Sequence, residues 1–193
     1  MTSKRTVLLG SLVAAVVLLA CGGRTWVEGA VHDAVLRNST VSVSGNDAAG
    51  GVVAAALVGA AATVATATGG RVVRWVGAVA TLLAGVLAVV LTVGVLVDPA
   101  GVVGEHAAET TGRTGSVDAD GSVTVWVWLS LLGAVLLTAA GGLALAGIRR
   151  WVGLSSRYDA PTGEARSARE ASDWDRLSQG QDPTVDGTTD PPR

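Results

Sequence analysis

The stretch VVRWVGAVATLLAGVLAVVLTVGVLV, residues 72–97, decides the fold class of this chain. Beyond Arg74 near its start, the stretch contains no Asp, Glu, Lys, Arg or His. About 20 mostly apolar residues are enough for a helix to cross the hydrocarbon core of a bilayer. The stretch therefore predicts a helix that spans a membrane.

Three other segments share this character, and they are residues 6–22, 48–68 and 123–148. Only 16 % of the 193 residues are charged, against about 25 % in an ordinary soluble domain. We therefore expect an all-α integral membrane protein with four transmembrane helices in residues 1–148. Residues 149–193 are expected to form a mostly disordered cytoplasmic tail that contains a short inducible helix. The lipid bilayer is then the main predicted partner of the chain.

Basic residues flank the predicted spans on one side of the membrane. They are Lys4, Arg5, Arg71, Arg74, Arg149, Arg150 and Arg157. The segment 98–122, on the opposite side, carries five acidic residues and a single Arg. Because Lys and Arg in short flanks stay on the cytoplasmic side, both termini are predicted to be cytoplasmic. The richness in Ala, Val, Gly and Arg is typical of a GC-rich genome, and we expect a multi-pass protein of a bacterial plasma membrane.

Tryptophan positions agree with the predicted ends of the spans. Five of the six tryptophans lie there, at positions 26, 75, 126, 128 and 151. A Trp ring is apolar and its N–H needs a polar partner, so the membrane interface suits it. The sixth, Trp174, lies in the polar tail and is not explained by the membrane.

Small residues at spacing four predict close helix packing. One set is Gly77, Thr81 and Gly85, and another is Thr138, Gly142 and Ala146. These sets fit either the interior of a single four-helix bundle or an oligomer face. In a chain so rich in Ala and Gly, the internal role is favoured, and the oligomeric state stays open.

The segment VVLLACGG, residues 16–23, has two interpretations. A basic start, an apolar run and a small residue before Cys21 resemble a lipoprotein signal, in which the cysteine becomes the acylated N-terminus. Leu19 is bulky for such a signal, and Trp26 continues the run as an interface anchor would. Retention of the segment as the first span is therefore favoured.

Catalytic and metal-binding motifs are lacking, since no GxSxG, HExxH, P-loop or CxxC pattern occurs. His106 and Glu109 would share one face of a helix, but a metal site needs three or four ligands. Solvated loop residues are the favoured interpretation. We expect no enzyme activity, no cofactor and no metal, and the net charge of −2 argues against a nucleic-acid partner.

The tail contains SDWDRLSQGQDPT, residues 172–184. A short helix over 173–179 would place Trp174 and Leu177 side by side, and Gly180 is a natural stop. So short a helix is marginal in water unless it binds a surface. The alternatives are docking to a partner through these two side chains and a disordered tail whose Trp is incidental or lies on the bilayer.

Three short motifs carry a family resemblance: GRTWV at 23–27, RYDAP at 157–161 and DWDRLSQGQDPT at 173–184. With the four spans, they resemble the Trp biosynthesis-associated membrane protein family of actinobacteria over about residues 5–184. The resemblance implies a small four-span protein with no established activity. It carries over onto Arg24, Trp26, Arg157, Tyr158, Asp173, Trp174, Leu177, Gly180, Asp182, Pro183 and Thr184.

On this resemblance, we expect an accessory or scaffold protein associated with tryptophan biosynthesis. The tail motif would dock a cytoplasmic partner such as an enzyme of the pathway. The alternative is a channel or exporter, not coupled to ions, for tryptophan or a related aromatic metabolite. Its path would use Thr63, Thr66 and Thr81, because the predicted spans lack ionisable residues in their interiors, where coupled transporters commonly place them.

Overall fold

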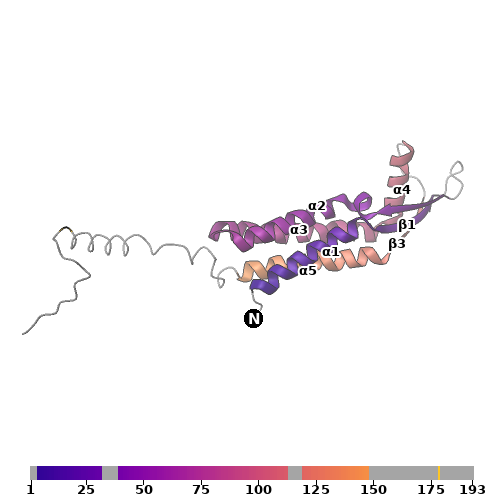
Figure 1. The fold of residues 1–193 in the computed structure, drawn as a ribbon. Coiled ribbons are helices and arrows are strands. Elements are labelled where there is room, and N and C mark those ends of the chain that lie inside the picture. The colour runs from indigo at the N-terminus through magenta and orange to yellow at the C-terminus, as the bar shows by residue number, and fades with distance from the viewer. Residues whose placement is uncertain (1–3, 32–38, 113–118, 148–177, 179–193) are drawn as a thin grey trace, which may run out of the picture. The chain divides into compact units, whose positions relative to one another are not determined.

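Four long helices form an up-and-down bundle in the computed structural model, which describes residues 4–31, 39–112, 119–147 and 178 (Figure 1). They are α1 (Lys4–Gly22), α2 (Gly45–Thr68), α3 (Arg71–Val97) and α5 (Val125–Gly147). All four are long and apolar enough to cross a membrane. The prediction of a mostly helical protein with four membrane spans is confirmed.

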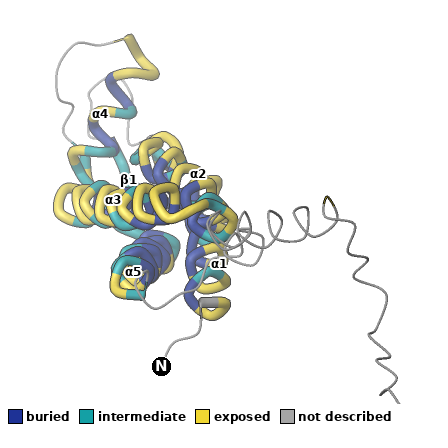
Figure 2. The backbone as a smooth tube through the Cα atoms, turned by 90° about the vertical axis from the view of Figure 1, so that its left-hand side faces the viewer, coloured by how far each residue is buried: buried dark blue, intermediate teal, exposed yellow. Residues whose placement is uncertain are grey.

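Each helix of the bundle packs against two neighbours. The pairs in contact are α1 with α2, α2 with α3, α3 with α5, and α5 with α1. Buried positions line the interior and exposed positions cover the outside (Figure 2). Exposed Leu and Val side chains on the outside are suited to lipid, which is as apolar as they are.

Glycines let the backbones of α3 and α5 come into contact. A Cβ added to Gly141 would lie 2.6 Å from the Cα of Leu82, and one added to Gly85 would lie 2.5 Å from the backbone N of Thr138. Gly77, Thr81 and Gly85 are all buried, as expected for internal packing. In the last span, the predicted packing glycine was Gly142, but the glycine that faces inward is its neighbour Gly141. A Cβ on Gly142 would meet nothing within 4 Å.

Four threonine hydroxyls inside the bundle are satisfied within their own helices. The buried side chains of Thr63, Thr66, Thr81 and Thr92 each donate a hydrogen bond of 2.8–2.9 Å to the carbonyl four residues earlier. A hydroxyl bonded in this way can be buried in an apolar bundle without a second helix as partner.

The segments expected to be loops form a folded cap at one end of the bundle, which the all-α prediction missed. Its strands are β1 (Thr25–Val31), β2 (Ser39–Ser44) and β3 (Ala119–Val123), in the order β2-β1-β3 with both pairs antiparallel. Its helix is α4 (Pro99–Thr111). We call the sheet and α4 together the cap, and the end of the bundle that carries it the sheet end.

One face of the sheet is covered by α4. Val27, Val31 and Val43 from the strands are fully buried in one cluster with Val103 of α4. Gly29 allows the close approach, since a Cβ there would lie 2.9 Å from the Cγ2 of Val103. The opposite face carries exposed polar side chains, which are Glu28, Thr40, Ser42, Asp120 and Ser122.

Local capping fixes where the helices of this end begin. Ser44 accepts a hydrogen bond from the backbone N–H of Asp47 (3.3 Å) and donates one to its carboxylate (2.6 Å), so its side chain caps the start of α2. Asp98 accepts from the N–H of Gly101 (2.8 Å) and is followed by Pro99, which suits the first position of α4. The chain therefore leaves α3 and enters α4 without a loop.

Adding a methyl group at Gly141 is expected to destabilise the bundle, while the same change at Gly142 is not. Gly141→Ala forces α5 away from the backbone of α3, and such overpacking costs about 1–3 kcal/mol. Gly142→Ala is the matched control, because it adds the same atoms into open space. Denaturant unfolding in detergent measures both free energies, and equal values for the two variants would contradict this packing.

Candidate functional site

The Trp26 side chain is buried where the sheet meets the bundle. Its exposed fraction is 0 %, and its indole N–H donates a 2.9 Å hydrogen bond to the carbonyl of Cys21 at the end of α1. The ring lies against the start of α2, where a Cβ on Gly45 would be 2.5 Å from the ring atom Cε2. The indole fits at this position because residue 45 is glycine, since a side chain at residue 45 would overlap the ring.

A β-bulge turns the Trp26 ring inward. In the pairing of β1 with β2, Thr25 lies opposite Ser44 and Val27 lies opposite Val43, so Trp26 is the extra residue. A bulge changes the direction in which a side chain points. Without it, Trp26 would share the face of Glu28, which is exposed.

Backbone bonds at the same place join three helices to the sheet. The N–H of Gly45 donates to the carbonyl of Arg24 (3.0 Å), and the N–H of Thr124 donates to the carbonyl of Trp26 (2.8 Å). The hydroxyl of Thr124 donates to the carbonyl of Thr25 (2.6 Å). We call residues 21–27 with Gly45 and Thr124 the junction, since the end of α1 and the starts of α2 and α5 all meet there.

Arg24 contributes a cation–π contact at the junction. Its guanidinium carbon lies 5.0 Å from the ring centroid of Trp126, within the range of a favourable interaction.

The interface role predicted for Trp26 is wrong, since that ring is enclosed by protein. Trp75 and Trp128 remain suited to the interface, with exposed fractions of 41 % and 57 %.

Cys21 lies in the last turn of α1 and is buried. Ala14 and Leu18 of the same helix are fully buried in the core. Cleavage before Cys21, as in a lipoprotein, would remove α1 from this core and leave an open side on the bundle. The packing therefore favours retention of α1 as the first span.

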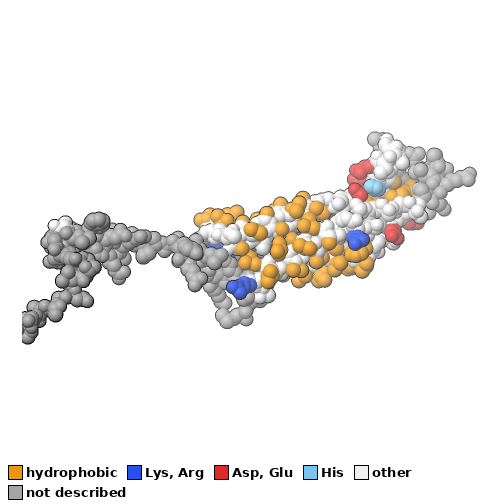
Figure 3. Space-filling model, in the orientation of Figure 1, with side chains coloured by type: hydrophobic (Ala, Val, Ile, Leu, Met, Phe, Trp, Pro, Cys, Tyr) orange, Lys and Arg blue, Asp and Glu red, His pale blue; other side chains and the backbone are white. Residues whose placement is uncertain are grey.

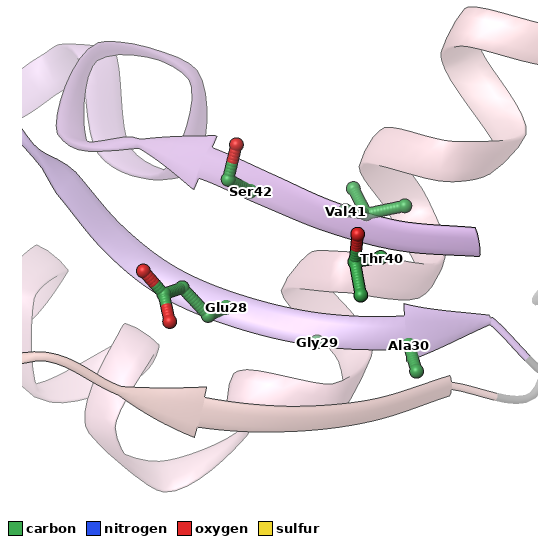
Figure 4. Close-up of a pocket in the computed structure, with 6 residues that line it drawn as sticks. All are labelled: Glu28, Gly29, Ala30, Thr40, Val41 and Ser42. Carbon is green, nitrogen blue, oxygen red and sulfur yellow. The ribbon is translucent and has the colours of Figure 1, made fainter. Parts of the chain in front are cut away.

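A hollow of about 450 Å³ lies on the open face of the sheet (Figure 4). It is lined by residues of β1 and β2, which are Glu28, Gly29, Ala30, Thr40, Val41 and Ser42. Its polar groups are one carboxylate and two hydroxyls. No motif in the sequence pointed to it, although the alternation T-V-S-V-S at 40–44 is a strand signal.

A second hollow, of about 170 Å³, lies between the start of α2 and α4. His106 and Glu109 both line it, so the prediction that a helix would bring them to one face is confirmed. Acidic side chains and the histidine gather at this end of the molecule (Figure 3). Among the described residues, no three His, Cys, Asp or Glu side chains are grouped so that they could hold a metal ion.

Thr63, Thr66 and Thr81, the residues predicted to line a transport path, surround one small cavity inside the bundle. Ser11 of α1 also lines it, and the volume is about 10 Å³. That is roughly the space of one water molecule. The structure thus brings the three threonines together, around a space far smaller than an indole ring.

The predicted tail sites, Asp173, Trp174, Leu177, Gly180, Asp182, Pro183 and Thr184, lie outside the described residues, as do Arg157 and Tyr158. Within the predicted helix over 173–179, only Ser178 is described, and it is helical and exposed. The docking role of the tail therefore stays a prediction.

A comparison with protein-family models matches residues 8–184 to the family described as tryptophan-associated transmembrane protein. The chain belongs to this family. The match begins within α1 and covers the rest of the bundle, the whole cap and the tail motif up to Thr184. A search of curated proteins gave no match. The predicted family is confirmed, while its restriction to actinobacteria stays a prediction. The family's description names a membrane protein and a link to tryptophan, with no reaction.

Replacing Trp26 by Ala is expected to loosen the cap from the bundle. Loss of a fully buried Trp costs about 3–5 kcal/mol, and the carbonyl of Cys21 loses its indole donor. The matched control is Trp128→Ala, because that ring is largely exposed on α5. Unfolding free energies in detergent and protease cleavage within residues 39–44 measure the effect. If Trp128→Ala were the more damaging change, the junction would not be the link we describe.

Proposed function

We propose that this protein is a membrane-embedded accessory of tryptophan biosynthesis and not an enzyme. The bundle would serve as an anchor, and the tail motif would dock a cytoplasmic partner such as a pathway enzyme. The observation that supports an anchor is how little space the bundle leaves where the predicted path would run. Its cavity at Thr63, Thr66 and Thr81 has a volume of about 10 Å³, and the family supplies the association with tryptophan.

The packing of the spans weighs against the transport alternative. An exporter for an aromatic metabolite needs a path as wide as the indole ring, but α3 and α5 are in backbone contact at Gly85 and Gly141. The hydroxyls of Thr63, Thr66 and Thr81 are engaged with carbonyls of their own helices. Opening a path would require the separation of α3 and α5, whose close contact depends on Gly85 and Gly141.

The distribution of charge supports the proposed orientation in the membrane. The start of α1, the connection from α2 to α3 and the end of α5 share the end of the bundle opposite the cap (Figure 1). Arg5, Arg71 and Arg74 lie at that end, while the described acidic residues lie in the cap or next to it. By the positive-inside rule, the basic end faces the cytoplasm of a bacterial cell and the cap faces outward.

The proposed docking motif combines an apolar pair with a fixed turn. Trp174 and Leu177, three residues apart, would lie on one face of a helix and could fill a groove on the partner. Asp182 and Pro183 favour a defined turn after Gly180, because Asp bonds to nearby backbone and Pro restricts φ. A buried Trp is a common hot spot of binding.

Trp174→Ala is expected to lower recovery of the partner by more than about tenfold, as for a hot-spot Trp. The measurement is co-purification of tryptophan-pathway enzymes in mild detergent from native cells. Trp174→Phe is the matched control, because it keeps an apolar ring, and Asp182→Ala tests the turn. Amounts of each variant in the membrane should equal those of the unaltered chain.

Equal recovery with Trp174→Ala would contradict the docking proposal. A transporter predicts the reverse pattern, in which deletion of the whole gene changes tryptophan or indole efflux and the tail variants behave as wild type. Measuring efflux in the deletion strain and in the Trp174→Ala strain therefore separates the two functions.

A further inference from the structure

We infer that β2 is a docking edge for an extended polypeptide segment that carries a Lys or Arg, supplied by a partner on the side of the membrane that the cap faces. The segment would add to the sheet as a fourth strand beside β2. Its basic side chain would cross Ser42 to reach Glu28. This site uses no residue of the tail and does not depend on the proposed docking of a cytoplasmic enzyme.

The first observation is that β2 is an unprotected edge. In the described part of the chain, β2 pairs with β1 alone. Its sequence STVSVS contains no charged residue, no Pro and no Gly. Native edge strands are normally protected by such residues, and the other edge, β3, carries Asp120 and Gly121. An open edge of this kind is the surface on which strand addition takes place.

The second observation is the hollow beside that edge. Ser42 lies opposite Glu28, and Glu28 lies opposite Ser122, so the three form one row across the exposed face. Neighbouring strands are about 4.8 Å apart. A residue of an added strand beside Ser42 would thus be about 10 Å from Glu28 between Cα atoms. The small Ser42 side chain leaves the intervening hollow of about 450 Å³ open (Figure 4).

Charge selects the side chain that would cross this hollow. Glu28 contributes a carboxylate, and Thr40 and Ser42 contribute hydroxyls. None of the described strand residues is Lys or Arg. A long cationic side chain can lie over Ser42 with its charge at Glu28, and its apolar stem can pack over the strand backbone. An acidic side chain would be repelled there.

The direction of the strands excludes the β2 strand of a second copy as the occupant. The strands run roughly along the length of the bundle (Figure 1). Two identical edges pair in antiparallel fashion about a two-fold axis perpendicular to the sheet. That axis would lie in the plane of the membrane and would turn the second bundle upside down. Pairing of two β2 edges is therefore ruled out, and we assign the site to a different polypeptide.

The test measures peptide binding to the full-length protein in lipid nanodiscs. The probe is a labelled seven-residue peptide of alternating Thr and Val with a central Lys on the Thr-bearing face, and its twin carries Glu at that place. Fluorescence anisotropy should show the Lys peptide binding roughly fivefold more tightly than its twin, the size expected for an exposed ion pair. Hydrogen exchange should show protection of the amides of residues 39–44 when the Lys peptide binds.

Two substitutions make the assignment specific. Glu28→Gln should make the two peptides bind equally, because it removes the charge and keeps the shape. Ser42→Lys should weaken binding of the Lys peptide by about fivefold or more, because the protein's own ammonium then occupies Glu28 and repels the peptide's, and Ser42→Ala is its matched control. Thermal midpoints equal to wild type establish that these exposed changes leave the fold intact.

The inference is overturned if both peptides bind the wild-type protein equally, or if neither binds. It is also overturned if residues 39–44 gain no protection, or if Ser42→Lys binds as wild type does. Full competition by butylamine at the concentration of the peptide would instead assign the hollow to a small amine and refute strand addition.

Discussion

Burial of the Trp26 indole at the junction is the constraint on which the cap depends. A large apolar ring with one N–H can be enclosed by protein only where an acceptor is present, and the carbonyl of Cys21 is that acceptor. The β-bulge aims the ring, Gly45 leaves room for it, and the backbone of the same segment bonds to the starts of α2 and α5. One short stretch therefore ties the sheet to three of the four spans. Arg24 and Trp26, which the sequence resemblance predicted as motif residues, both lie within this stretch.

The bundle and the cap are stabilised in different ways. Inside the bundle, lipid provides no hydrophobic driving force between helices, so stability comes from close backbone approach, with the buried threonine hydroxyls bonded within their own helices. In the cap, Val side chains between the sheet and α4 are removed from water in the ordinary manner of a soluble domain. One chain therefore combines the packing of a membrane bundle with the core of a soluble domain.

Much of the fold could be predicted from the sequence, because an uncharged apolar run of span length has few alternatives. The inward face of α3 was also predictable from Gly77, Thr81 and Gly85. The inward face of α5 was not, since small residues occur on every side of that helix and Gly141 and Gly142 are adjacent. The sheet was missed because its strands are short and β1 pairs with β3 about ninety positions later in the chain. Trp26 was assigned to the interface because its position at the end of a span gives no sign of the bulge that turns it inward.

The order of strands in the sheet has a consequence for biogenesis. The central strand β1 follows the first span, while β3 is made only after α2 and α3. The sheet can therefore be completed only when both of these helices have crossed the membrane and returned the chain to the side of β1. If either failed to insert, β3 would be left on the opposite side and β1 would become an open edge of the sheet. A complete cap therefore indicates that the chain has acquired its correct membrane topology.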